Sequence, residues 1–78
     1  MSITVLYFAS LRDAAGMASE VLPMPDSLAA LYEGLRAKHG FSLPASRLRV
    51  AMDGEFVDWD AAPRDGAEIA FIPPVSGG

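Results

Sequence analysis

The sequence predicts a small α+β domain in which one main helix packs on one face of a mixed sheet of four to five strands. Three observations lead to this prediction. Strand-like segments open and close the chain, the clearest helical pattern lies between them, and these two end segments are the most apolar of the predicted strands. The 78 residues suffice for one domain, and 51% of them are hydrophobic, which is too apolar for a disordered protein.

The first part of the chain is predicted to form a hairpin or near-hairpin around a short helix. Residues 3–8 are rich in β-branched and aromatic side chains, and apolar residues on both faces favour a central strand. A short helix over residues 11–15 is predicted to stop at Gly16, a natural C-terminal cap. A second strand is predicted over residues 19–22, ended by the prolines that follow it.

The main helix is predicted to begin after Asp26 or Ser27, either of which can cap it by accepting backbone amide hydrogens. Apolar residues then recur at i, i+3, i+4 and i+7, which builds one apolar stripe. These residues are Leu28, Leu31, Tyr32 and Leu35. Gly40 is predicted to end the helix, because glycine readily adopts the left-handed cap conformation.

The last part of the chain is predicted to add two or three strands. Residues 47–52 alternate between polar or small and large apolar side chains, and the Asp-Gly pair at 53–54 signals a hairpin into residues 55–57. A second Asp-Gly turn at 65–66 precedes the final strand, residues 68–72. If the first and last strands are adjacent at the centre of the sheet, they run parallel across a long crossover. That arrangement is the β-grasp, or ubiquitin-like, fold.

The end of the sequence is predicted to be a flexible arm, residues 73–78, attached to a domain formed by residues 1–72. Its two prolines cannot continue an interior strand and so make a stiff spacer. The arm consists of Pro73, Pro74, Val75, Ser76, Gly77 and Gly78, none of which has a charged side chain. A slender arm of this kind suits insertion into a narrow pocket of another protein, so we interpret the Gly78 carboxyl as the reactive group. The alternative is an ordinary disordered tail.

The run Phe71-Ile72-Pro73-Pro74-Val75-Ser76-Gly77-Gly78 closely resembles the C-terminus of the small subunits of molybdopterin synthases. Residues 65–70 resemble the turn and strand that precede it in that family. Residues 5–9, with Leu11 and Arg12, resemble the family's first strand and its exit. Sulfur carriers of the thiamine pathway and ubiquitin-related modifiers share the fold and the Gly-Gly end, but usually lack the Pro-Pro-Val-Ser lead.

This resemblance implies a sulfur carrier that is not catalytic by itself and binds no cofactor. An ATP-dependent, ubiquitin-activating-like adenylyltransferase would adenylate the Gly78 carboxylate, and sulfur from an indirect donor enzyme would then replace AMP. The resulting thiocarboxylate would enter the large synthase subunit and pass its sulfur to cyclic pyranopterin monophosphate, which builds the molybdopterin dithiolene. The alternatives are a carrier for thiamine thiazole or another thiolation pathway, a ubiquitin-like protein modifier, or an interaction module.

The resemblance also suggests which residues face the large subunit. Phe8, Phe56 and Ile72 are candidates for a hydrophobic patch, with Arg12 at its rim. Large apolar anchors are what such interfaces favour. The competing interpretation is that all three apolar residues belong to the core.

Charge and composition exclude several other classes of function. A formal net charge of −4 argues against nucleic-acid binding, and no apolar run is long enough to span a bilayer, so we expect a cytoplasmic protein. The sequence has no cysteine, so any reactive sulfur must come from outside the chain. His39 is expected to be a helix-end cation, Asp58 and Asp60 to be solvated rather than metal ligands, and Trp59 to pack.

Overall fold

The computed structural model describes residues 1–73, and the following elements lie within them. In chain order they are β1 (Ser2–Tyr7), α1 (Ala9–Ala15), β2 (Ser19–Pro23), α2 (Leu28–His39), the 3₁₀ turn η1 (Ala45–Arg47), β3 (Arg49–Met52), β4 (Glu55–Val57) and β5 (Glu68–Ile72). The predicted arm residues Pro74, Val75, Ser76, Gly77 and Gly78 lie outside the described residues. The division into a domain and an arm therefore stays a prediction.

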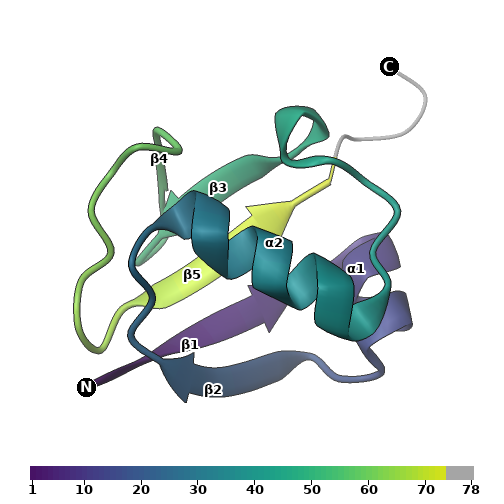
Figure 1. Ribbon diagram of the computed structural model, residues 1–78, viewed down its shortest axis with the longest axis horizontal. Coiled ribbons are helices and arrows are strands. Elements are labelled where there is room, and N and C mark those ends of the chain that lie inside the picture. The colour runs from purple at the N-terminus through teal and green to yellow at the C-terminus, as the bar shows by residue number, and fades with distance from the viewer. Residues whose placement is uncertain (74–78) are drawn as a thin grey trace.

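The five strands form one mixed sheet in the order β2-β1-β5-β3-β4. The neighbours β1 and β5 run parallel, whereas the other three pairs are antiparallel. Helix α2 crosses one face of this sheet (Figure 1). First and last strands thus lie side by side in the interior of the sheet, which confirms the predicted β-grasp topology.

The core lies between the sheet and α2, and strand register decides which side chains enter it. Tyr7 of β1 is opposite Phe71 of β5, which is opposite Val50 of β3, and all three are buried. Successive side chains of a strand point to opposite faces, so every second residue of these strands reaches the same core. The predicted helix stripe packs there too: Leu28, Leu31, Tyr32 and Leu35 are all buried.

The ends of α2 follow the predicted capping chemistry. The Ser27 hydroxyl oxygen accepts a hydrogen bond from the backbone N–H of Ala30 at 3.0 Å, so Ser27 rather than Asp26 is the cap. Gly40 ends the helix with φ of 73°, a left-handed conformation that costs glycine nothing. Its N–H donates to the Arg36 carbonyl and closes the last turn.

Helix α1 begins two residues earlier than predicted. Phe8 is extended, and Ala9 then takes φ of 50°, an uncommon angle for a residue with a Cβ. This reversal turns the chain directly from β1 into the helix, whose residue Leu11 is buried. Gly16 ends the helix with φ of 73°, as the sequence predicted.

The predicted hairpin after β3 is confirmed. Asp53 and Gly54 both have positive φ, 53° and 86°, which suits the two-residue turn of a β-hairpin. The Asp53 carboxylate also accepts the backbone N–H of Glu68 at 3.0 Å and a hydrogen bond from Arg64 at 3.1 Å. The turn is therefore tied to the start of β5, which helps to set the register of the two strands.

Candidate functional site

Helix α2 packs on one face of the sheet, and the opposite face carries exposed side chains, Phe8 and Phe56 among them. Register places Leu6, Ala70, Ala51 and Phe56 in one row across four strands. The next row contains Ile72 and its partner Arg49, and Phe8 follows Tyr7 at the end of β1. We call this set the open face: it consists of Leu6, Phe8, Arg49, Ala51, Phe56, Ala70 and Ile72.

Large apolar side chains protrude from the open face. Phe8 is 45% exposed and Phe56 is 55% exposed, so the interpretation of these two as core residues is wrong. Ile72 is half-buried, and the small residues Ala51 and Ala70 form a floor between the larger side chains. A group of exposed aromatic and aliphatic side chains on one face is typical of a surface that another molecule covers.

Arg12 is exposed on α1, and its backbone N–H donates a hydrogen bond to the Phe8 carbonyl at 3.3 Å. It therefore lies one helical turn beyond Phe8, the residue predicted to share its interface. No carboxylate in residues 1–73 forms an ion pair with it. Its predicted place at the rim of an interface stays a prediction.

Arg49 is a member of this surface that the sequence analysis missed. Its guanidinium carbon lies 3.9 Å from the centre of the Phe56 ring, in a cation–π contact. The alternating pattern of residues 47–52 already indicated that Arg49 points away from the core. Its neighbours could not be predicted, because they depend on how β3 pairs with β4 and β5.

The open face adjoins the place where the predicted arm begins. Ile72 is the last residue of β5, and Pro73, which is half-buried, is the last described residue. In Figure 1, β5 runs through the centre of the sheet beside β1, and the two parallel strands end on the same side of the molecule. A partner that covers the open face would therefore also contact the start of residues 73–78.

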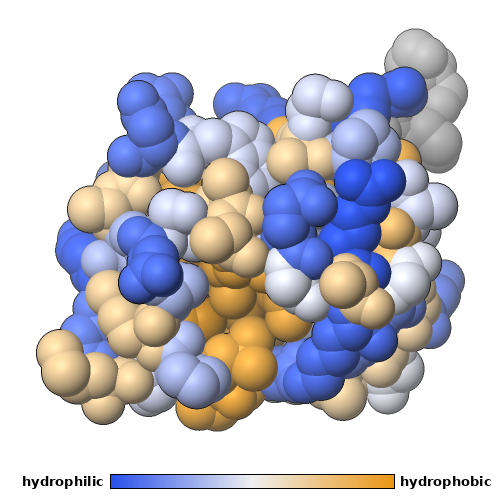
Figure 2. Space-filling view, viewed as in Figure 1, coloured by the Kyte–Doolittle hydropathy of each residue, from blue (hydrophilic) through white to orange (hydrophobic). Residues whose placement is uncertain are grey.

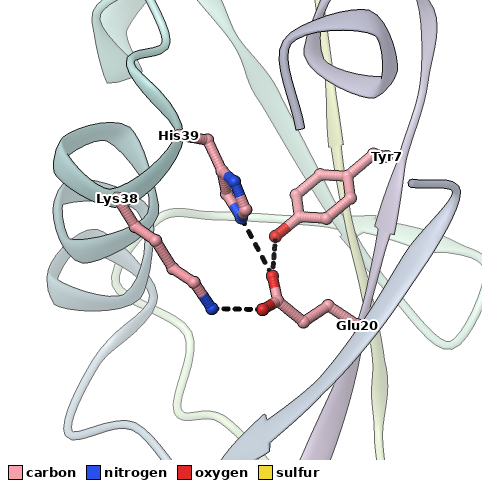
Figure 3. Close-up of polar contacts among 4 residues, drawn as sticks. All are labelled: Tyr7, Glu20, Lys38 and His39. Atoms are coloured by element: carbon pink, nitrogen blue, oxygen red, sulfur yellow. Dashed lines mark hydrogen bonds and ion pairs between the residues drawn. The ribbon is translucent and has the colours of Figure 1, made fainter. Parts of the chain in front are cut away.

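A group of polar side chains lies on the α2 side. Glu20 of β2 accepts a hydrogen bond from the Tyr7 hydroxyl at 2.8 Å and from His39 Nε2 at 3.0 Å. Its other oxygen pairs with the Lys38 ammonium group. Figure 3 shows these side chains converging on one carboxylate from β1, β2 and the end of α2. The cluster thus ties the outermost strand β2 to the helix.

This arrangement shifts two pKa values in opposite directions. The hydrogen bond from Lys38, helped by those from His39 and Tyr7, lowers the pKa of Glu20 from 4.5 to about 2, against the opposing effect of burial. Burial, together with the hydrogen bond to Glu20, raises the pKa of the Tyr7 hydroxyl. Glu20 is therefore ionised and Tyr7 neutral at pH 7.

His39 lies in the last turn of α2, as expected, but it is packed against the fold. Its side chain is only 9% exposed, and its ring packs edge-on against Tyr7 with the centroids 5.6 Å apart. Its nitrogen contacts Glu20 rather than a nucleophile or a metal site, which leaves it a structural part of the cluster. Sequence spacing could not reveal this, because Glu20 and His39 are 19 positions apart.

A shallow apolar hollow of about 280 Å³ lies between β2 and α2. It is lined by Leu22, Pro23, Ala30, Leu31, Gly34, Leu35 and Lys38. Figure 2 shows the molecule from the α2 side, where the most hydrophobic surface gathers in this region. A Cβ added at Gly34 would meet nothing within 4 Å, so the glycine is not required for a close approach to the sheet.

Three further residues that the sequence analysis considered are Asp58, Trp59 and Asp60. Asp58 and Asp60 are exposed, and residues 1–73 contain no group of three or more His, Cys, Asp or Glu side chains arranged to hold a metal. Trp59 packs as predicted: it stacks on Phe71 with ring centroids 5.6 Å apart and donates to the Leu48 carbonyl. None of the helices described is both long and apolar enough to span a bilayer.

Comparisons with known proteins identify the family and agree with this fold. The model of the ThiS family matches residues 5–78. A molybdopterin synthase sulfur carrier subunit from Escherichia coli K12 is 35% identical over 97% of this chain and 99% of its own length. A human protein of the same name is 33% identical over 97% of this chain and 93% of its own length.

Solved structures of similar fold cover the whole chain. The SAMP1 protein of Haloferax volcanii has a TM-score of 0.79 at 25% identity, with 100% of both chains covered. A complex of subunits 1 and 2 of the molybdopterin-converting factor from Helicobacter pylori 26695 contains a chain with a TM-score of 0.71 at 23% identity, again with 100% of both chains covered. The second likeness supports the fold alone.

Proposed function

This chain belongs to the ThiS family, and from that premise we propose that it is the sulfur carrier subunit of a molybdopterin synthase. The observation that carries the proposal is the open face, an exposed apolar surface from which β5 leads directly into residues 73–78. A carrier needs both features. The surface binds the enzyme, and the segment that follows delivers the reactive end into a site of that enzyme.

The proposed reactive group is the carboxylate of Gly78. An ionised carboxylate is a poor electrophile at neutral pH, so it needs a leaving group before sulfur can attack. Adenylation by an ATP-dependent activating enzyme supplies AMP as that group and releases pyrophosphate. A sulfur nucleophile then displaces AMP and leaves a thiocarboxylate. Because the chain has no cysteine, the sulfur originates from a separate donor enzyme.

The arm residues would contribute shape rather than chemistry. Glycine at positions 77 and 78 lets the backbone enter a site too narrow for a Cβ. Pro73 and Pro74 limit the freedom of their own segment before docking, which reduces the entropy lost on binding. No bound cofactor is part of the proposal. ATP is consumed by the activating enzyme, so we place the carrier in the cytoplasm beside it.

The proposed partner of the open face is the large synthase subunit. Full burial of a Phe or Ile side chain contributes roughly 1.5–3 kcal/mol. Phe8, Phe56 and Ile72 together can thus offset the cost of ordering the last residues of the arm, at about 1–2 kcal/mol per residue. A surface that is exposed in the free carrier would be covered in the complex.

Reconstitution with the acceptor tests the proposed function. Carrier, activating enzyme, ATP and sulfur donor are combined with the large subunit and cyclic pyranopterin monophosphate, and formation of the dithiolene product is measured. We expect product with the unaltered chain and none after one alanine is added beyond Gly78, with the same unfolding midpoint for both. Product from the extended chain would contradict a role for the Gly78 carboxylate.

A protein modifier is the second candidate, favoured by the similarity to SAMP1 of Haloferax volcanii. SAMP1 is a small archaeal modifier protein. A modifier would leave a branched Gly-Gly remnant on lysines of other proteins, which mass spectrometry of cell proteins detects. A thiazole carrier, the third possibility, would support sulfur transfer to a thiazole precursor instead of the pterin.

A further inference from the structure

We infer that the large-subunit surface covering the open face presents a carboxylate to Arg49, so that Arg49 helps to select the partner. This inference rests on the proposed function and concerns the same surface. It adds a charged recognition element to a face that otherwise presents apolar side chains. The partner would therefore combine an apolar contact area with an Asp or Glu side chain at a defined place.

Arg49 lies within the open face and not beyond its edge. In the sheet its backbone is opposite Ile72 of β5 on one side. On the other side its guanidinium group lies 3.9 Å from the centre of the Phe56 ring. Any molecule that covers both Ile72 and Phe56 must also cover the side chain between them.

Covering an unpaired guanidinium group is unfavourable, because the charge loses its hydration. Arginine cannot escape the cost by deprotonation at physiological pH. The contact with Phe56 occupies one face of the planar group, which leaves its edge N–H donors for a partner. A carboxylate can accept two of them in a bidentate pair, the geometry for which arginine is best suited.

No carboxylate among residues 1–73 forms an ion pair with Arg49. The ion pairs of this region join Glu20 to Lys38 and His39, and Asp53 to Arg64. Of the strand acids, Glu20 is in the cluster on the α2 side, while Glu55 and Glu68 are at the far ends of their strands from Ile72. Asp58 directly follows β4, in line with Arg49, but it is exposed and forms no ion pair within residues 1–73. The compensating charge is therefore expected on the partner.

The ring contact also prepares Arg49 for recognition. A free arginine side chain loses rotamer freedom when it binds, which costs conformational entropy. The cation–π contact with Phe56 restricts that freedom before the partner arrives. Phe56 consequently has two roles in the proposed complex, as an apolar anchor and as the support that orients Arg49.

Calorimetric titration of the full carrier with the large subunit tests the inference through three substitutions. We expect Arg49→Glu to raise the dissociation constant roughly 100-fold or more, and Arg49→Leu to raise it at least about tenfold, since each leaves the facing carboxylate unpaired. Arg49→Lys keeps the charge but loses the fork geometry, so we expect an intermediate loss. Higher salt should weaken the binding of the unaltered carrier to the large subunit more than the binding of the Arg49→Leu variant.

Arg64 supplies the matched control. It is 64% exposed and paired with Asp53, away from the open face. We expect Arg64→Leu to change the dissociation constant by less than about twofold, because exposed pairs contribute little. Unfolding midpoints of all variants check that the fold persists, and Arg49→Leu introduces no repulsion that could disturb it.

Two results distinguish failure of this inference from failure of the proposed function. If the unaltered carrier binds the large subunit and Arg49→Leu binds as tightly or more tightly, no carboxylate faces Arg49 and the inference is wrong while the function stands. If the unaltered carrier does not bind the large subunit at all, the proposed function fails and this inference with it. Restoration of Arg49→Glu binding by a Lys at one acidic position of the large subunit would identify the paired residue.

Discussion

Glu20 is the residue on which the attachment of β2 to α2 depends. It receives hydrogen bonds from three side chains on two other elements. Only the carboxylate form can accept all of them, which is the physical cause of its low pKa. The pKa of Glu20 is lower in the folded state than in the unfolded chain. The cluster therefore stabilises the protein at pH values above the pKa that Glu20 has in the unfolded chain.

The pH dependence of stability follows with a definite sign. The contribution of Glu20 is fully present above pH 4.5 and is lost as pH falls toward about 2, its folded pKa. We expect Glu20→Gln to lower the free energy of unfolding by about 2 kcal/mol at pH 7, since charge-assisted hydrogen bonds are lost. Urea unfolding at several pH values should show this difference shrinking below pH 4.5. A difference independent of pH would exclude an ionised Glu20 as its source.

Phe8 is one of the exposed residues of the open face, and we expect it to contribute little to the stability of the fold. Because it is 45% exposed, we expect Phe8→Asp to change the unfolding midpoint little. We expect the same substitution to weaken binding of the large subunit at least about tenfold, because a buried aromatic anchor is replaced by a charge. Met17, which is 40% exposed outside the open face, provides the control Met17→Asp. Equal effects of the two substitutions on binding would remove Phe8 from the interface.

At the scale of elements, α2 and its C-terminal cap include two glycines with opposite requirements. Gly34 lies in the helix, where a Cβ would meet nothing within 4 Å, whereas Gly40 has φ of 73° at the cap. We expect Gly34→Ala to raise the free energy of unfolding by up to about 1 kcal/mol, through helix propensity. We expect Gly40→Ala to lower it by about 1 kcal/mol, through the left-handed backbone.

Chemical denaturation of both variants measures these changes. The pair differs in backbone conformation but not in the atoms added, so each substitution controls for the other. Stabilisation by both, or destabilisation by Gly34→Ala alone, would mean that the surroundings of α2 differ from those described here.

Elements with strong local signals could be predicted from the sequence. The stripe and caps of α2, the hairpin at 53–54 and the final strand all depend on residues close together in the chain. The start of α1 was missed because Ala9 has a positive φ, which no propensity indicates for alanine. The Glu20 cluster was missed because it joins residues of β1, β2 and α2 that are distant in sequence. The Arg49–Phe56 contact was missed because it depends on side-chain conformation as well as on the hairpin that brings the two residues together.

At the scale of the whole molecule, the β-grasp topology divides the sheet between two tasks. One face is covered by α2 and holds the core, whereas the other leaves Phe8 and Phe56 exposed. The central strand β5 belongs to both faces and leads toward the proposed reactive end. The topology could be predicted because the two end segments are so apolar. The exposure of Phe8 and Phe56 was suggested only by the resemblance, since exposed and core phenylalanines look alike in a sequence.

Intact-mass spectrometry of the carrier, after incubation with the activating enzyme, ATP and a sulfur donor, tests the central claim most directly. Exchange of one oxygen for sulfur, located at Gly78 by fragmentation and absent when ATP is omitted, is the result we predict. An unchanged mass under conditions that load an authentic carrier, or sulfur located at any other residue, would contradict it.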